Sequence, residues 1–320
     1  MIGRRILSIV GIKGFCVMWL IAVNVSCGRS VADHVIFRGP VPKVVLGSSD
    51  ELYRFLTYDE QRYPLVSAHR GGPMKGYPEN ALETFEFQSK RQPLIIECDI
   101  QMTRDSVLIL MHDATLDRTS DGEGVIAHHT YEEIQSLRLK DPDGTLTTFG
   151  IPTLDEALQW GVGNVIFMLD VKRGVPYSRV VDVVQRNRAE AYAIIATLTA
   201  DEALEVHRLD PSLMISASIH SRLDFLRISD RNVPDNRLVA FVGTGEANEQ
   251  VYGLLHGHGI MCILRTTAHP DGAAEQMDAE YFERLVESGA DIISTDQPII
   301  AGKALEIYRK KNRLVSDFIK

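Results

Sequence analysis

From Pro64 to the end of the chain, short uninterrupted apolar runs alternate with longer amphipathic stretches. An apolar run without polar alternation is typical of a strand covered on both faces, and repeated strand–helix alternation indicates a parallel sheet. The expected strands are Leu65–Ala68, Leu94–Ile100, Val107–Met111, Val165–Leu169, Tyr192–Ala196, Leu213–Ser218, Leu238–Val242, Ile260–Leu264 and Ile292–Ser294. The expected helices include Ala81–Lys90, Arg179–Arg188, Asp201–Leu209, Glu249–His256, Ala279–Ser288 and Ala304–Lys311.

A series of strands this long predicts an α/β fold that closes into a (β/α)8 TIM barrel. The alternative is an open doubly wound sheet, but the chain has no Gly-rich dinucleotide-binding or P-loop motif that would favour it. The length of 320 residues also leaves room for one barrel with additional segments.

Two segments lie outside this alternation. Residues 28–63 form a poorly patterned lead-in, so the barrel is expected over residues 64–320. Residues 115–160 are too many for a simple βα loop and are rich in Asp, Gly, Thr and Pro. We expect them to form a small insertion after the second βα unit, with a short helix at Tyr131–Arg138, on the face that carries the site.

The N-terminus has the pattern of an export signal. Arg4 and Arg5 precede an apolar stretch that ends at Ser26–Cys27, so residues 1–27 are expected to be a signal peptide. Cys27 is also placed to be the lipid-bearing first residue of a lipoprotein, although Asn24 stands where such signals prefer Leu. Plain cleavage and a retained anchor are the alternatives. We expect a periplasmic protein or a lipoprotein that contacts the membrane only through Cys27.

The net charge and the cysteines each exclude or favour one property of the protein. The formal net charge of −9 argues against nucleic acid as a partner. Cys98 and Cys262 both lie in apolar, strand-like runs. An exported protein can join such residues in a disulfide, but two buried free thiols are favoured because Cys is a good small core residue.

Acidic side chains follow two of the expected strands. Glu97 and Asp99 come after Leu94–Ile96, and Asp170 comes after Val165–Leu169. Side chains two residues apart in a strand share a face, and the carboxyl ends of barrel strands form the mouth where active sites lie. Carboxylates gathered there repel one another unless a cation joins them. Because all the donors are oxygen, the sequence predicts a site for one divalent cation, Ca²⁺ or Mg²⁺.

Histidine and basic side chains follow other expected strands. His69 and Arg70 follow the first expected strand, and His112 follows the third. Two such imidazoles beside a carboxylate cluster are a candidate acid–base pair. The Arg70 guanidinium matches phosphate geometry, and Lys172 adds a second cation. The sequence therefore predicts His69 and His112 as catalytic residues, with Arg70 and Lys172 as ligands of a substrate phosphate.

Several neighbouring residues allow two interpretations. Asn80 is expected to cap the helix that begins at Ala81, with Glu83 completing a capping box. Glu79 either faces the site, behind the residues that contact the ligand, or has no role beyond the start of this helix. His256–Gly257–His258 has a metal-like spacing, but termination of a helix at Gly257 is the favoured reading. The role of Asp296, at the end of the last expected strand, is left open.

At this point the chain resembles the glycerophosphodiester phosphodiesterases. The resemblance rests on an ordered series of motifs that covers essentially the whole chain after the lead-in. These are His69–Arg70–Gly71, Pro78–Glu79–Asn80, Glu97 with Asp99, Thr103 with Asp105, His112–Asp113, Leu116 with Arg118 and Thr119, Gly122 with Gly124, Ile151–Leu154, Asp170 with Lys172, and Thr295–Asp296 with Pro298.

The resemblance implies a (β/α)8 barrel with a small insertion, one divalent metal on Glu97, Asp99 and Asp170, and acid–base catalysis by His69 and His112. It also implies release of an alcohol and glycerol 3-phosphate from a small-molecule glycerophosphodiester, with a cyclic phosphate as a further variant. Asp170 stands where the family usually has Glu, and the last third of the chain matches loosely. The alternatives are a phosphodiesterase acting on intact lipid and a non-catalytic protein that binds phosphorylated ligands.

Overall fold

The computed structural model describes residues 41–245, 248–266 and 278–320. The expected signal peptide and Cys27 therefore lie outside the described residues. Within the described ranges, no helix has both the length and the hydrophobicity that crossing a bilayer requires.

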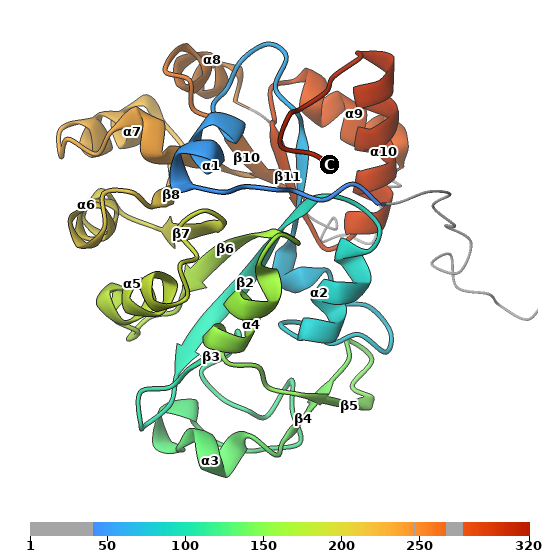
Figure 1. The fold of residues 1–320 in the computed structure, drawn as a ribbon, viewed down its shortest axis with the longest axis vertical. Coiled ribbons are helices and arrows are strands. Elements are labelled where there is room, and N and C mark those ends of the chain that lie inside the picture. Colours follow the sequence, from blue (N-terminus) through green and yellow to red (C-terminus); the bar gives the residue numbers. More distant parts are fainter. Residues whose placement is uncertain (1–40, 246–247, 267–277) are drawn as a thin grey trace, which may run out of the picture. The chain divides into compact units, whose positions relative to one another are not determined.

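The predicted (β/α)8 barrel is confirmed. A sheet of nine strands runs in the order β1-β11-β10-β9-β8-β7-β6-β2-β3, and a further pairing of β1 with β2 closes eight of them into a parallel barrel (Figure 1). The strands of the barrel are β1 (Leu65–Ala68), β2 (Leu94–Met102), β6 (Ile166–Val171), β7 (Ala193–Thr197), β8 (Met214–Ser218), β9 (Leu238–Thr244), β10 (Cys262–Arg265) and β11 (Ile292–Thr295).

Helices follow the barrel strands and cover their outer faces (Figure 1). They are α2 (Leu82–Ser89), α4 (Leu154–Gly161), α5 (Tyr177–Arg186), α6 (Ala200–Leu209), α7 (Arg222–Ser229), α8 (Glu249–Gly257), α9 (Ala279–Glu287) and α10 (Pro298–Lys311). The N-cap residues of α4 and α6 are Thr153 and Thr199, which form capping boxes with Glu156 and Glu202. The sequence therefore fixes where α4 and α6 begin.

The prediction that Asn80 caps α2 is wrong. The N-cap residue is Ala81, which gives no side-chain hydrogen bond, and Asn80 is buried in a left-handed conformation with φ of 57°. Asn tolerates this conformation better than most residues because its side chain can form local hydrogen bonds. The amide is directed to the carboxylate cluster instead.

Strand alternation divides the buried residues into two layers. On β2, Ile96 and Cys98 face the helices, whereas Ile95 lies in the core inside the barrel. The same alternation places Ile166 and Met168 of β6 inside. Toward the carboxyl ends of these two strands the inward positions change from apolar to acidic, so this side of the interior is apolar at the base of the barrel and acidic at its mouth.

The base of the barrel is closed by a helix that the sequence did not predict. Helix α1 (Ser49–Phe55) lies within the lead-in, and its Leu52 and Phe55 join the core inside the barrel (Figure 1). Ser48 caps this helix by accepting a hydrogen bond from the backbone amide of Glu51. Seven residues are too few for a clear periodicity, which explains why the pattern was missed.

The insertion lies between β2 and α4, within the second βα unit. It contains β3 (Leu108–Leu110), η3 (Ile126–His128), α3 (Tyr131–Ile134), β4 (Arg138–Lys140) and β5 (Leu146–Gly150). Strand β3 pairs antiparallel with β2 and is not a barrel strand, which corrects the expectation of a further parallel strand at Val107–Met111. The short helix ends earlier than expected because β4 begins at Arg138. The insertion also has a small core of its own, which includes Ile109, Leu116 and Ile134.

Both cysteines of the described barrel, Cys98 and Cys262, are buried free thiols, as the sequence favoured. Their side chains lie in the layer between strands and helices. They act there as small apolar core residues.

Candidate functional site

Three carboxylates meet at the mouth of the barrel. Glu97 and Asp99 come from β2 and Asp170 from β6, and Asp99 and Asp170 are direct partners in the strand register. One oxygen from each of the three lies within 4.8 Å of the others. The structure thus places close together the three acidic residues that the sequence analysis identified at the strand ends.

The electrostatics of this cluster favour a cation. Burial and the neighbouring charge of Asp99 raise the pKa of Glu97 well above its usual value, and the backbone amide of Arg70 offsets this only in part. Burial alone would also raise the pKa of Asp99, but the ammonium of Lys172 and a hydrogen bond from Asn80 lower it. A bound divalent cation would relieve the repulsion that remains, and an all-oxygen donor set fits Ca²⁺ or Mg²⁺.

Lys172 lies between two of the acids. Its Nζ is 2.5 Å from Oδ1 of Asp99 and 2.5 Å from Oδ2 of Asp170. These two charges raise the pKa of Lys172 against the effect of burial. The lysine that was predicted to bind phosphate therefore contacts the carboxylates in this structure, directly beside the predicted metal ligands.

Each histidine at the mouth has a carboxylate on Nδ1. His69 Nδ1 is 2.6 Å from Oδ1 of Asp296, and His112 Nδ1 is 2.8 Å from Oδ1 of Asp113. A carboxylate in this position selects the tautomer with the proton on Nδ1 and leaves Nε2 for proton transfer. Burial would raise the pKa of Asp296, but the hydrogen bond from His69 lowers it.

Arg70 is held by a tight turn after β1. Its φ is 51°, and Gly71 and Gly72 also have positive φ, so the chain leaves the strand abruptly. A Cβ on Gly71 would lie 2.3 Å from the Phe85 ring, which leaves no room for a side chain. The Arg70 amide donates to Oε2 of Glu97 at 2.7 Å. Its Nε is buried, makes no hydrogen bond among the described residues, and lies 3.7 Å from Oδ2 of Asp99.

Two residues of the Pro78–Glu79–Asn80 motif point into the site. Glu79 accepts hydrogen bonds from Arg70 and from Arg118. Asn80 donates to Oδ2 of Asp99 at 2.7 Å and accepts from the Asp99 amide at 3.0 Å. Asn80 therefore fixes the orientation of a predicted metal ligand, while Glu79 links two guanidinium groups.

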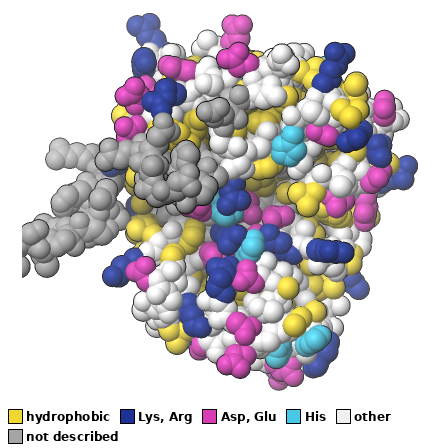
Figure 2. Space-filling model, turned by 180° about the vertical axis from the view of Figure 1, so that it is seen from behind, with side chains coloured by type: hydrophobic (Ala, Val, Ile, Leu, Met, Phe, Trp, Pro, Cys, Tyr) yellow, Lys and Arg dark blue, Asp and Glu magenta, His cyan; other side chains and the backbone are white. Residues whose placement is uncertain are grey.

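The mouth is hollowed by a cavity of about 150 Å³, lined by His69, Glu97, Asp170, Phe241 and Arg265 among others. On the face turned away from the viewer in Figure 1, basic, acidic and histidine side chains gather near the centre (Figure 2). The cavity thus combines cations, carboxylates and one apolar wall.

Sequence reasoning missed Arg265 and did not assign Arg118 or Asp113 a role. Arg265 directly follows the expected strand Ile260–Leu264, so the rule that located His69 and Asp170 would also have found it. Its Nη2 is 3.3 Å from Nδ1 of His69. Arg118 and Asp113 lie in the insertion, where no periodicity indicates which side chains turn toward the barrel.

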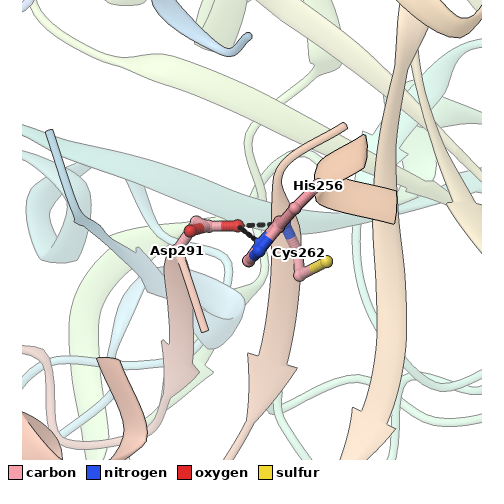
Figure 3. A group of neighbouring side chains, drawn as sticks. All are labelled: His256, Cys262 and Asp291. Atoms are coloured by element: carbon pink, nitrogen blue, oxygen red, sulfur yellow. Dashed lines mark hydrogen bonds and ion pairs between the residues drawn. The ribbon is translucent and has the colours of Figure 1, made fainter. Parts of the chain in front are cut away.

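A second ligand-like group, formed by His256, Cys262 and Asp291, lies at the base of the barrel (Figure 3). The buried Asp291 accepts from Nε of Arg62 at 2.5 Å, from the Cys262 amide at 2.7 Å and from Nε2 of His256 at 2.9 Å. Figure 3 shows the Cys262 sulfur directed away from the other two side chains. The Asp291 carboxylate therefore already has hydrogen-bond partners within the protein. Through Arg62 it connects the lead-in to the barrel. The prediction that α8 ends at Gly257 is confirmed.

The closed barrel, with an oxygen-ligand cluster and two carboxylate-paired imidazoles at its mouth, defines a TIM-barrel enzyme with a divalent-metal type of site. The sequence profile of the glycerophosphoryl diester phosphodiesterase family matches residues 69–300. The chain belongs to this family, and it is a phosphoric diester hydrolase. The family uses a divalent metal, and the acidic cluster provides the residues that could bind one.

Known proteins agree with this assignment. The chain is 25% identical to a glycerophosphodiester phosphodiesterase of Bacillus subtilis, covering 76% of this chain and 87% of that protein. A glycerophosphoryl diester phosphodiesterase from Parabacteroides distasonis is 35% identical, with a TM-score of 0.78 over 84% of this chain and 95% of that chain. An Oleispira antarctica phosphodiesterase, solved with its product sn-glycerol-3-phosphate, shares the fold at 18% identity, with a TM-score of 0.61 over 76% of this chain and 97% of its own.

Removing Asp291 should destabilise the barrel. In Asp291→Ala the partly buried Arg62 guanidinium loses its carboxylate, so we expect the free energy of unfolding to fall by about 3–5 kcal/mol. Urea denaturation followed by circular dichroism measures this change. The matched control is Asp201→Ala, which removes an exposed carboxylate paired with Arg231; it should leave the unfolding midpoint nearly unchanged. Equal midpoints for the two variants would contradict the structural role of Asp291.

Proposed function

We propose that the protein hydrolyses glycerophosphodiesters to an alcohol and glycerol 3-phosphate. The observation that carries this proposal is the cluster of Glu97, Asp99 and Asp170, with oxygens within 4.8 Å of one another, at a mouth that also holds two carboxylate-paired histidines. Family membership supports the reaction class. The product named for the Oleispira antarctica protein supports glycerol 3-phosphate as the product here.

Glu97, Asp99 and Asp170 are the residues that would hold the divalent cation, Ca²⁺ or Mg²⁺. When bound, such an ion neutralises charge on the phosphodiester and on the oxygen that leaves it. Asn80 serves this arrangement by fixing Asp99 through two hydrogen bonds. Asp170 reaches one methylene less far than the Glu usual in the family, but its carboxylate still lies within 4.8 Å of those of Glu97 and Asp99.

Arg70 binds the phosphate through the part of its guanidinium that Glu79, which holds Nη1, leaves free. A fixed, planar donor suits a phosphoryl oxygen in both the substrate and the transition state. Lys172 supplies a second positive charge at the same edge of the barrel. Together these two cations orient the diester so that its phosphorus faces the space between the histidines.

His69 and His112 perform the proton transfers. One imidazole removes the proton of the attacking hydroxyl as its oxygen forms a new bond to phosphorus. The other donates a proton to the leaving oxygen as the old phosphorus–oxygen bond breaks. If the attacking group is the neighbouring hydroxyl of the substrate's glycerol, a cyclic phosphate forms, and water opens it with the two histidines in exchanged roles. The presence of both paired histidines favours an enzyme over a phospho-ligand binding protein.

The reaction is tested with purified protein and a panel of glycerophosphodiesters in the presence of Ca²⁺ or Mg²⁺. We expect release of glycerol 3-phosphate, and its loss when a chelator removes the cation. The variant His112→Asn should reduce kcat by about 10²–10⁴-fold, because one proton transfer loses its catalyst, while product binding in calorimetry persists. Absence of glycerol 3-phosphate from every substrate with either cation would exclude the proposed function.

We also propose that the protein is exported and that Cys27 carries a lipid. The apolar stretch before Ser26–Cys27 supports this proposal. When the full chain is expressed in bacteria with labelled palmitate, the wild type should incorporate label and fractionate with membranes. Cys27→Ser should lose the label and should be recovered as soluble periplasmic protein or retained with its signal uncut. Label in Cys27→Ser equal to that in the wild type would contradict the assignment.

A further inference from the structure

A continuous chain of alternating charges links the two sides of the mouth. It starts at Arg70 on the turn after β1, passes through Glu79 and Arg118, and ends at Asp113 and His112. Its two ends are the proposed phosphate ligand and a proposed catalytic histidine. Its central pair, Glu79 and Arg118, has no role in the mechanism described so far.

Arg118 contacts two carboxylates with two edges of one guanidinium. Toward Glu79, Nη1 and Nη2 donate to the two carboxylate oxygens at 3.0 and 2.8 Å. Toward Asp113, Nε and Nη2 donate at 2.7 and 3.0 Å. A planar group held on two edges has little rotational freedom, and an ammonium group has no such geometry. Arg118 therefore fixes the angle between the two carboxylates.

Glu79 lies between two cations. Its side chain is only 12% exposed, and both of its oxygens are 3.2 Å from Nη1 of Arg70. A nearly buried carboxylate shared by two guanidinium groups holds them together and screens their repulsion. With Nη1 of Arg70 held in this way, the guanidinium keeps its place beside the acidic cluster, where its Nε lies 3.7 Å from Oδ2 of Asp99.

The chain of charges also connects the barrel with the insertion. Glu79 lies in the connection between β1 and α2, whereas Arg118 and Asp113 belong to the segment after β3. Ala81 of that connection joins Leu116 in one small core, so apolar packing accompanies the ion pairs. The contacts of Arg118 with Glu79 thus help to hold Asp113 in place relative to the barrel.

We infer that Glu79 and Arg118 are positioning residues, which hold the His112 imidazole and the Arg70 guanidinium at a fixed separation across the mouth. The inference rests on the proposed function, because it takes the roles of His112 and Arg70 from it. A purely structural ion pair between insertion and barrel is the competing explanation. The two differ in what they predict for turnover at temperatures well below unfolding.

The test is a double-mutant cycle with Glu79→Gln, Arg118→Gln and the double variant. A displacement of reacting groups by about 1 Å costs on the order of 100-fold in rate, so each single variant should lose about that much in kcat/KM. Glu79→Gln should act mainly on KM, since it frees Arg70. Arg118→Gln should act mainly on kcat, since it frees Asp113 and His112. Because both single variants lose the contact between Glu79 and Arg118, the loss of kcat/KM in the double variant should be smaller than the product of the two single losses.

Two further variants separate positioning from stability. Arg118→Lys keeps the charge but not the two-edged geometry, so it should restore little of kcat. The control Arg186→Gln removes an exposed arginine that also makes two hydrogen bonds to one carboxylate, Asp155, outside the mouth; its kinetics should match the wild type. The melting temperature of each variant should stay within a few degrees, about 4 °C, of the wild type.

The outcomes distinguish the two proposals. Active wild type together with unchanged kcat and KM in the single variants would overturn the inference and leave the proposed function standing. A loss of activity that parallels a loss of folded protein, or full rescue by Arg118→Lys, would also overturn it. A wild type that neither cleaves glycerophosphodiesters nor binds sn-glycerol 3-phosphate would remove both proposals.

Discussion

Repulsion among carboxylates at the ends of two adjacent strands is the constraint that organises this molecule. Asp99 is 1% exposed and lies beside Asp170 and Glu97. Buried like charges are costly unless positive groups or hydrogen-bond donors compensate them. The nearby compensation comes from separate elements: Asn80 from the connection before α2, the Arg70 amide from the turn after β1, and Lys172 from the end of β6. The acidic residues at the mouth therefore account for the positions of the groups that surround them.

The carboxylates at the two ends of the barrel differ in how many hydrogen-bond donors they have. Asp291 at the base receives three donors and sits next to an arginine, so its charge is balanced within the protein. Glu97 at the mouth has the backbone amide of Arg70 as its donor, and two acids as neighbours. Both groups satisfy a distance criterion for metal ligands. The two groups differ in the number of their hydrogen-bond donors, and this difference favours the mouth over the base as a site for a cation.

Most of the barrel could be predicted because it depends on local patterns. Uninterrupted apolar runs located its strands, and the two-residue period correctly placed Glu97 and Asp99 on one face of their strand. Predictions failed where a long-range contact overrides a local preference. Asn80 looked like a helix cap but serves Asp99, and β3 looked like a barrel strand but folds back on β2. The partners of Lys172 and Arg118 could not be read from sequence, because each is defined by which strands and loops become neighbours.

The insertion is packed on its own apolar residues, including Ile109, Leu116 and Ile134, and still supplies His112 and Asp113 to the mouth. The side chains that pack the insertion thus differ from those that it presents at the mouth. Substitutions within this small core can shift one of the two proposed catalytic histidines by small steps while the packing of the eight strands stays intact. A scaffold divided in this way offers a route by which relatives with the same barrel acquire different rates or preferences.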